Sequence, residues 1–449
     1  MQTAMRCVRV GQEIVFFFLL LGAFGLLAAG CAPGDVESQA GGGLPTGDGG
    51  VLPEAGGEQP NPGGDQPLDG VDNPPDGGIV DNPPDGGIVV DNPPAEGEGD
   101  NAPEGDGNVV PLGPIFTDVV FYDVYQPQVN LPTPPGVIRL NNSLNARKLS
   151  DPELSKLGAD LVLNVIIKAA CDNYDRIGSF HLALVPKGSE TYSPADVPRI
   201  EVARFITPFM DKNKQPDQVR YRFNVGKLAQ ILRDPALHAL YDIWAELEVG
   251  GVSSAAQQQV EGCKGRFDVF SASAEFVSSS NSIPEGKPFL LPLNFMKNLN
   301  NYEAGASDEL TKSVRTIPFQ LTEPITDAHF YLITSNHGSN QGGEEYNRRT
   351  HYIYLDGKLI AEYKPGGASC EPYRTYNTMS NGIYGPFPKL PFMWESWSNW
   401  CPGQSIPIRD LTMGTLPAGH HTFKISVPDA VFAGAQGNIA VSVYLQGTI

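Results

Sequence analysis

Carboxylates in three separate segments of the chain could perform acid–base chemistry. Asp175 lies between two apolar segments, with Arg176 beside it. Glu246 and Glu248 occupy alternate positions of a predicted strand, so their side chains share one face. Glu345 follows a glycine-rich loop, among aromatic and guanidinium groups. Opposed carboxylates with different pKa values can activate water and protonate a leaving group. Each segment alone is equally compatible with a surface ion pair or a solvated strand face.

Tryptophans gather in one later segment. Three of the four in the chain, Trp394, Trp397 and Trp400, fall within seven residues. This spacing in a loop is compatible with buried anchors and with rings that stack on sugars.

The elements that would position these groups are predicted to be antiparallel strands. Short apolar or alternating runs separated by Gly, Pro, Asn and Ser are typical of all-β domains. The clearest predicted strands are 161–167, 220–225, 266–276, 351–355 and 359–363. Asp356-Gly357 suits a tight hairpin turn, and 228–232 is the best helix candidate. About 340 residues of short strands exceed one sandwich core, and the Pro-rich stretch 283–292 is the predicted boundary between two.

Four motifs carry a resemblance to the peptide:N-glycosidase F family. Cys-Asp-Asn-Tyr-Asp-Arg at 171–176 resembles the family's Cys-Asp-Glu-Trp-Asp-Arg, and Ala-Arg-Phe-Ile-Thr-Pro-Phe at 203–209 resembles Gly-Arg-Phe-Ile-Thr-Pro-Tyr. Glu-Tyr-Asn-Arg-Arg-Thr-His at 345–351 resembles Glu-Trp-Cys-Phe-Arg-Thr-His, and Trp-Cys-Pro-Gly at 400–403 is identical to the family's motif. The motifs occur in the family's order, and the likeness covers roughly residues 150 to 449.

The resemblance implies an all-β fold of two side-by-side, eight-stranded jelly-roll sandwiches, which we assign to residues 108–285 and 286–449. It implies a monomer without metal or cofactor that cleaves the amide between an N-linked glycan and asparagine in glycoproteins or glycopeptides. Asp175 would be the principal catalytic carboxylate, Glu345 its partner and Glu246 a third acid. The predicted substrate-binding side chains are Arg176, Tyr174, Tyr346, Trp397, Trp400 and Arg349. If Arg176 keeps Asp175 ionised while another, desolvated acid keeps its proton, their pKa values separate as this chemistry requires.

One departure from the family's pattern bears on activity. Trp397 stands where the family has a site arginine, so Arg348 or Arg349 would have to supply the charge. An alternative hypothesis is therefore a surface protein that binds glycans without cleaving them. A third, a copper monooxygenase of similar architecture, fits poorly, because His420 and His421 are adjacent and would point to opposite faces of a strand.

The amino terminus is predicted to direct export. Arg6 and Arg9 precede an apolar run, and Ala-Ala-Gly-Cys at 28–31 is similar to the acylation site of bacterial lipoproteins. We therefore interpret 1–30 as a signal peptide and Cys31 as the lipidated residue, which would anchor the protein to the cell envelope by its lipid alone. An uncleaved membrane anchor is the alternative.

Residues 31–107 are predicted to form a disordered tether. This segment is rich in Gly, Pro, Asp and Asn, and it repeats Asp-Asn-Pro-Pro-Asp-Gly-Gly-Ile-Val at 72–80 and 81–89. It has no Lys or Arg and holds 17 carboxylates, most of the formal charge of -20. The remainder has no basic cluster, which argues against nucleic-acid binding.

Four cysteines remain beyond the signal region: Cys171, Cys263, Cys370 and Cys401. Their spacing lacks the short pairs of a zinc site, so disulfides are predicted, with three possible connectivities. The resemblance implies the pair Cys370–Cys401, which leaves Cys263 as the partner of Cys171.

Overall fold

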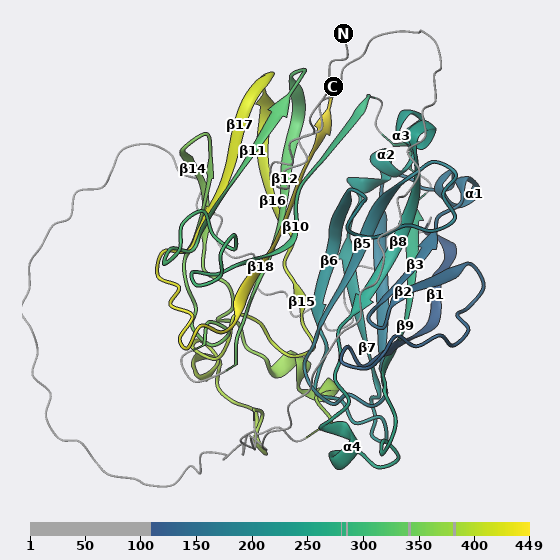
Figure 1. Ribbon diagram of the computed structural model, residues 1–449, viewed down its shortest axis with the longest axis vertical. Helices are drawn as coiled ribbons and strands as arrows, with labels where there is room; N and C mark the ends of the chain where they lie inside the picture. Colours follow the sequence, from purple (N-terminus) through teal and green to yellow (C-terminus); the bar gives the residue numbers. More distant parts are fainter. Residues whose placement is uncertain (1–108, 280, 284–285, 340–342, 380–382) are drawn as a thin grey trace, which may run out of the picture. The chain divides into compact units, whose positions relative to one another are not determined.

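The computed structural model describes residues 109–279, 281–283, 286–339, 343–379 and 383–449 (Figure 1). The predicted signal peptide, Cys31 and the tether lie outside these ranges. All described residues belong to one compact unit, Asn82–Ile449.

The first half of the described chain forms a sandwich of two antiparallel sheets. One sheet consists, in spatial order, of β1 (Val109–Tyr122), β9 (Asp268–Ser279), β4 (Leu161–Ala169) and β7 (Gln218–Asn224). The other consists of β6 (Arg199–Ile206), β5 (Ile177–Pro186), β8 (Tyr241–Val249), β3 (Leu144–Lys148) and β2 (Val137–Asn141). Because β1 pairs with β9 along its length, the residues from Val109 onward belong to this sandwich.

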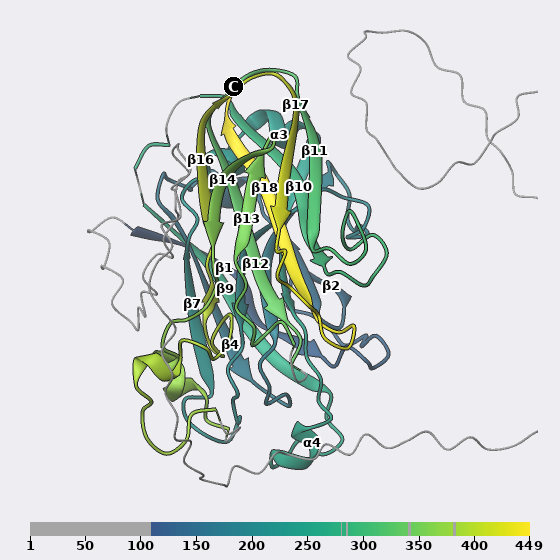
Figure 2. The ribbon, with the colours of Figure 1, turned by 90° about the vertical axis from the view of Figure 1, so that its left-hand side faces the viewer.

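The second half forms another antiparallel sandwich, whose strands are labelled in Figure 2. One sheet consists of β10 (Pro288–Leu299), β18 (Asn438–Thr448), β12 (Ile325–His337) and β16 (Arg409–Leu416). The other consists of β11 (Val314–Leu321), β17 (Gly419–Ser426), β13 (His351–Leu355) and β14 (Lys358–Tyr363). The boundary between the sandwiches lies between the end of β9 and the start of β10.

The strand order identifies both sandwiches as jelly rolls. When the strands of each are numbered along the chain, leaving β2 aside, one sheet contains the first, eighth, third and sixth strands. The other contains the second, seventh, fourth and fifth. This is the order that two interleaved Greek keys produce. The predicted pair of eight-stranded jelly rolls is confirmed.

Side-chain alternation explains why these segments form strands. Along β7 exposed and buried residues alternate, and Tyr221 and Phe223 point into the core. In the first core Phe180 makes edge-to-face contacts with Phe116 and Phe276, at centroid distances of 6.5 and 5.8 Å. Each sandwich therefore has an apolar core between its own two sheets.

Turns and helices follow the sequence closely. Asp356 and Gly357 adopt positive φ angles, 50° and 80°, in the hairpin between β13 and β14. The helices are short: α1 (Asp151–Leu154), α2 (Leu228–Leu232), α3 (Pro235–Leu240), α4 (Ala256–Gln259), and the 3₁₀ turns η1 (Glu371–Tyr376) and η2 (Pro391–Met393). Among the described residues, none of the helices has the length and apolar character to span a membrane.

The two sandwiches contact each other along a seam. The short strand β15 (Ser405–Ile406) comes from the second half of the chain but pairs with β6 of the first sandwich. Nearby, Phe295 of β10 packs against the His181 ring, with centroids 4.8 Å apart, and against the Arg199 guanidinium. The loop between β4 and β5 and the loop after β12 are brought to one region, since Asp175 of the first and Glu345 of the second interact electrostatically.

Two disulfides tie loops to the sandwiches. Cys171 is bonded to Cys263, 92 residues away, and Cys370 to Cys401, 31 residues away. Both predicted pairings are confirmed.

Candidate active site

The loop between β4 and β5 holds Asp175 at the seam. Its anchor is the neighbouring Asp172, which is fully buried and accepts hydrogen bonds from the backbone amides of Tyr174 (2.9 Å) and Val252 (2.7 Å). The guanidinium of Arg176 pairs with the same carboxylate, with Nε to Oδ2 at 2.6 Å. Arg176 is therefore bonded to Asp172 and not to the predicted catalytic Asp175.

The loop after β12 holds two adjacent glutamates with different surroundings. Glu344 is fully buried and accepts bonds from Arg349 (3.0 Å) and from the backbone amide of Val431 (2.8 Å). Its charge is thus used to fix the loop. Glu345 is held through its backbone carbonyl, which accepts bonds from the backbone and side-chain nitrogens of Asn399. Its carboxylate accepts a hydrogen bond from the backbone amide of Gly338 at 3.4 Å.

Asp175 and Glu345 interact electrostatically across the seam. Burial, and next the negative charge of Glu345, raise the pKa of Asp175 to about 7. Burial also raises the pKa of Glu345, and the hydrogen bonds from Tyr346 and the Gly338 amide, which act to lower it, offset only part of this rise. Because the charge of Arg176 only partly opposes these effects, the expectation that Arg176 keeps Asp175 ionised is wrong. Asp175 is instead the group that holds a proton near neutral pH.

Aromatic rings flank the two acids. Tyr174 is 39% exposed, packs on Phe209 at a centroid distance of 5.6 Å and carries the Arg176 guanidinium over its ring at 5.4 Å. From the second sandwich, Trp397 contacts Tyr346 edge to face, with centroids 5.3 Å apart. The pKa of Tyr346 is raised by burial and by the charges of Glu345 and Asp175, so its phenol stays protonated. The structure thus brings predicted binding residues from both sandwiches to the acids.

The other two tryptophans of this segment, Trp394 and Trp400, are buried and have structural roles. Trp400, predicted to bind substrate, is 5% exposed, and its indole N–H donates to the backbone carbonyl of Asn336 at 2.9 Å. It packs with Ile206 and Ile406 at the seam. Trp394 is 1% exposed and packs beside the second disulfide. A burial of this extent leaves no ring face for a sugar, so the prediction for Trp400 is corrected.

Glu246, predicted as the third acid, lies in a closed polar cluster. It accepts bonds from Tyr192 (2.6 Å) and from Nε of Arg199 (2.7 Å), and it contacts His181 at 3.2 Å, with no exposed surface. Burial acts to raise its pKa, but His181 and then the Arg199 charge lower it overall. Glu248 lies two residues further along the same face of β8, with 31% of its side chain exposed. Of the two, Glu248 is the one that a ligand could reach.

Comparisons with known proteins identify the fold. The family models for the N-terminal and C-terminal domains of peptide-N-glycosidase F match residues 114–252 and 306–446, together more than half of the chain. The chain belongs to the peptide:N-glycosidase F family. Its fold resembles that of PNGF-II at 20% identity and a TM-score of 0.54, covering 76% of this chain and 65% of that one. It also resembles the glycosylasparaginase PNGase F from Flavobacterium meningosepticum at 15% identity and a TM-score of 0.50, covering 76% and 96%. No curated protein sequence matches the chain.

The chain therefore spans about two thirds of the length of PNGF-II. At these identities the solved structures support the jelly-roll fold, and the chemistry has to be argued from the residues of this chain.

In this chain, the two arginines considered as substitutes for the missing site arginine make other bonds. The Arg348 guanidinium donates to the backbone carbonyls of Pro365 and Glu395, both at 2.7 Å, and so holds the tryptophan-bearing loop. Arg349, also predicted to bind substrate, is paired with Glu344. Among the described residues, neither Arg348 nor Arg349 is therefore bonded to Asp175 or to the carboxylate of Glu345.

A buried arginine that the sequence analysis did not single out links the sandwiches behind the acids. Arg204 pairs in bidentate fashion with Glu201, at 2.7 and 2.6 Å, and its Nη1 donates to Oγ of Ser335 at 2.7 Å. The same Oγ lies 2.6 Å from Nε2 of His337, whose pKa is lowered to about 3 by burial and by the Arg204 charge. The next residue, Gly338, donates its backbone amide to the Glu345 carboxylate at 3.4 Å. Arg204 therefore helps to set the position of Glu345.

The histidines considered for a metal are paired with other groups. His421, one of the two histidines considered for copper, contacts Asp356 at 2.8 Å, and two further histidines, His181 and His351, contact Glu246 and the backbone of Arg349. In the ranges that the structure describes, no group of three or more His, Cys, Asp and Glu side chains is arranged to hold a metal ion.

Proposed function

We propose that this protein is a peptide-N4-(N-acetyl-β-glucosaminyl)asparagine amidase that acts on N-linked glycoproteins or glycopeptides. Membership of the peptide:N-glycosidase F family supports a hydrolase. The observation that carries the proposal is the electrostatic coupling of Asp175 with Glu345. Two acids from different sandwiches whose charges interact can act together on one scissile bond.

The coupling assigns a role to each acid. Burial, and next the charge of Glu345, raise the pKa of Asp175 to about 7, so just below that pH we assign the proton of the pair to Asp175 and the negative charge to Glu345. In the reaction, Glu345 accepts a proton from a water molecule while the oxygen of that water bonds to the amide carbon. Asp175 donates its proton to the amide nitrogen as the carbon–nitrogen bond breaks. The products are an aspartate side chain and a glycosylamine, and the two acids exchange protons with solvent before the next turnover.

The surrounding side chains suit a glycan. Tyr174 and Trp397 present aromatic faces or edges from the two sides of the seam, and such rings pack well against the C–H faces of sugars. Arg176, fixed by Asp172, and the partly exposed Glu248 add hydrogen-bonding groups for sugar hydroxyls. Glu246 would act indirectly, by fixing the cluster beneath them.

The test is an incubation of the full chain with a denatured N-glycoprotein, followed by mass spectrometry of its peptides. Loss of the glycan together with conversion of asparagine to aspartate supports the amidase. Asp175→Asn should abolish this conversion, whereas Asp429→Asn, the same change at an exposed position, should not. Full activity of Asp175→Asn would overturn the assignment.

The alternative is a protein of the same fold that binds glycans without turnover, and Trp397 is the residue that favours it. The discriminating experiment measures glycopeptide binding and cleavage side by side in the wild type and in Trp397→Arg. Binding without cleavage in the wild type, with cleavage gained in the variant, would favour the alternative. Cleavage by the wild type excludes it.

For its location, we propose a protein exported and anchored to the cell envelope through a lipid on Cys31. The motif at 28–31 and the acidic, proline-rich segment that follows support a lipid anchor on an extended tether. Cys31→Ser should release the protein from the membrane fraction. Retention of this variant in membranes would instead indicate an uncleaved anchor.

A further inference from the structure

The loop that carries Trp397 also exposes a group of large apolar side chains. We call this group the apolar loop patch, and its members and their exposed fractions are Phe387 (78%), Leu390 (59%), Phe392 (64%) and Met393 (50%). All four lie between positions 387 and 393 of the chain. Apolar side chains that are exposed singly need no explanation, but an exposed group of them marks a surface that binds another molecule.

The loop is fixed by bonds on both sides of the patch. Arg374 pairs with Glu371 and donates to the backbone carbonyl of Phe387 at 3.1 Å, and the backbone amide of Lys389 donates to the same Glu371 carboxylate at 2.7 Å. The buried Trp394 follows the patch directly. Three prolines fix φ angles within the segment: Pro386, Pro388 and Pro391. A ligand that binds here therefore has little loop entropy to remove.

One end of the loop adjoins Glu345. Trp394 contacts Trp397 edge to face at a centroid distance of 6.1 Å, and Trp397 contacts Tyr346 at 5.3 Å. The hydroxyl of Tyr346 donates a hydrogen bond to the Glu345 carboxylate. A short chain of ring contacts thus connects the patch with one of the proposed catalytic acids.

The same loop contacts the side of the seam that holds Asp175. The backbone amide of Met379 donates to the carbonyl of Phe209 at 2.9 Å, and Phe209 packs on Tyr174, the neighbour of Asp175. Figures 1 and 2 both show the segment between β14 and β15 at the end of the molecule where α4 lies, away from α3. A polypeptide whose asparagine lies at the acids therefore has this loop as a neighbour.

The charges of the loop favour a polypeptide over a lipid surface as the occupant. Loops that bind membranes place free Lys or Arg side chains beside their apolar residues. Here Arg374 is paired with Glu371, and the ammonium of Lys389 donates to the carbonyl of Ile383 and lies 4.7 Å from the centre of the Trp394 ring. The neighbouring Glu395 is exposed and would repel anionic headgroups.

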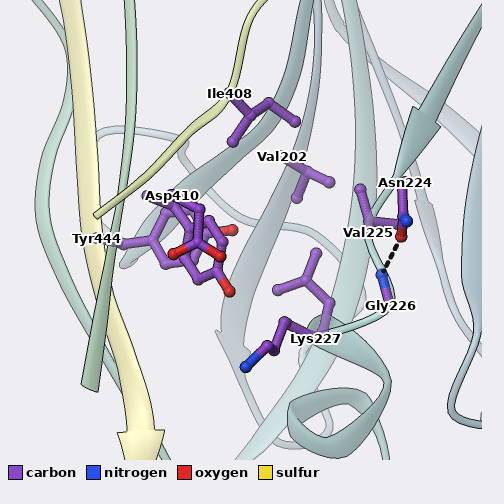
Figure 3. A pocket seen from close by; sticks show the side chains of 10 residues that line it. Val202, Asn224, Val225, Gly226, Lys227, Ile408, Asp410 and Tyr444 are labelled. Carbon is purple, nitrogen blue, oxygen red and sulfur yellow. Dashed lines mark hydrogen bonds between the residues drawn. The ribbon is translucent and has the colours of Figure 1, made fainter. Parts of the chain in front are cut away.

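Another opening on the seam is less suited to an apolar segment. It is a pocket of about 340 Å³ between residues 224–228 of the first sandwich and β12, β16 and β18 of the second. Figure 3 shows the charged side chains of Lys227 and Asp410 in this pocket. An apolar ligand there would remove these charges from water, which is costly.

We propose that the apolar loop patch binds apolar side chains of the polypeptide that flanks the glycosylated asparagine. This inference rests on the proposed amidase function and extends it from the glycan to the peptide part of the substrate. Unfolded segments expose the Phe, Leu and Val side chains that native proteins bury. The patch therefore favours unfolded glycoproteins and glycopeptides with apolar flanks.

The first test measures binding without catalysis, by fluorescence anisotropy of two labelled peptides that carry no glycan. Both have about twelve residues around a central Asn-Gly-Thr; one has Phe and Leu on each side of it, and the other has Ser at those positions. The full chain should bind the apolar peptide about tenfold more tightly, because its side chains leave water on the patch. Phe387→Ser/Phe392→Ser should abolish this preference and keep the wild-type melting temperature, since both rings are exposed.

A single substitution has a matched control. Leu390→Ser should weaken binding of the apolar peptide by about threefold, whereas Leu240→Ser should leave it unchanged, although the two leucines are similarly exposed, at 59% and 62%. Leu240 ends α3, at the opposite end of β8 from Val252 and its partner Asp172. The proposal is overturned if the two peptides bind alike, or if both leucine variants have the same effect. Loss of binding to phosphatidylglycerol vesicles in the double variant, without any peptide preference in the wild type, would indicate a membrane surface instead.

Kinetics with the glycosylated forms of the two peptides separate this inference from the amidase itself. We expect KM to be about tenfold lower for the apolar glycopeptide, and the double variant should raise that KM with kcat unchanged, because the patch lies outside the catalytic pair. Cleavage of both glycopeptides with equal KM would overturn the patch and leave the amidase standing. Cleavage of neither, together with patch-dependent peptide binding, would contradict the amidase and support the patch.

Discussion

Replacing Asp175 by asparagine should abolish activity and at the same time stabilise the fold at alkaline pH. The carboxyl has a pKa of about 7 in the folded protein and an ordinary value of 3.8, a difference of 3.2. A group with a raised pKa is favourable while protonated, and stability falls as pH rises through the window from 3.8 to about 7. Asparagine does not ionise, so the variant lacks this loss.

The size of the effect can be bounded. At about 1.36 kcal/mol per pKa unit the shift corresponds to at most about 4 kcal/mol, and the partial exposure of Asp175 reduces this to about 2 kcal/mol through solvent screening. For some 340 folded residues, an unfolding entropy of about 2.1 cal/mol/K per residue converts this gain into a rise in Tm of about 3 °C.

The assay is thermal unfolding of the wild type and Asp175→Asn at pH 4 and pH 8, with Asp429→Asn as the exposed control. The melting temperatures should coincide at pH 4 and differ by about 3 °C at pH 8, with the variant higher. Equal melting temperatures at pH 8, or a variant that is less stable there, would refute the electrostatic reasoning.

Four further substitutions and one double variant test the structural roles. Arg204→Met should destabilise the protein by about 3–5 kcal/mol, because it leaves Glu201 buried and unpaired, and the double variant Arg204→Met/Glu201→Leu should recover most of that loss in chemical denaturation; equal losses would contradict the pairing. Cys370→Ser should lower the free energy of unfolding of the oxidised protein by about 3–4 kcal/mol, because it frees a loop of 31 residues. Under reducing conditions the wild type and the variant should be equally stable. Trp400→Phe should lower stability by about 2–3 kcal/mol without weakening glycopeptide binding, whereas Trp397→Ala should weaken binding and leave the melting temperature nearly unchanged; the reverse pattern would restore Trp400 as a binding residue.

The sequence was sufficient for the fold because its signals are local. Period-two alternation predicted β7, the continuous apolar run at 161–167 predicted β4, and Asp356-Gly357 predicted its hairpin. The family motifs then supplied the pairing of the two jelly rolls. These features depend on neighbouring residues or on a pattern already known, so they are visible without coordinates.

The electrostatics of the site could not be predicted, because they depend on contacts between distant segments. Arg176 is four residues from Asp172 and one from Asp175, and the backbone amide of Val252, in the loop after β8, helps to make Asp172 the anchor. Likewise, Glu246 and Glu248 are equivalent in the sequence. The closed cluster around Glu246 forms from strands that are adjacent only in the folded sheet.

The burial of Trp400 also has a non-local cause. Its loop contains the strand β15, which is captured by β6 of the other sandwich, and this pairing draws the indole into the seam. A spacing of three between tryptophans does not by itself distinguish a buried ring from one that stacks on a sugar.

The most direct measurement of the central claim is an NMR titration of the Asp175 side-chain carboxyl carbon in the wild type and in Glu345→Gln. We predict a midpoint near 7 in the wild type and a lower one in the variant, because the substitution removes the negative charge that opposes ionisation of Asp175. A wild-type midpoint near the ordinary value of 3.8, or one that does not move when Glu345 is neutralised, would contradict the account.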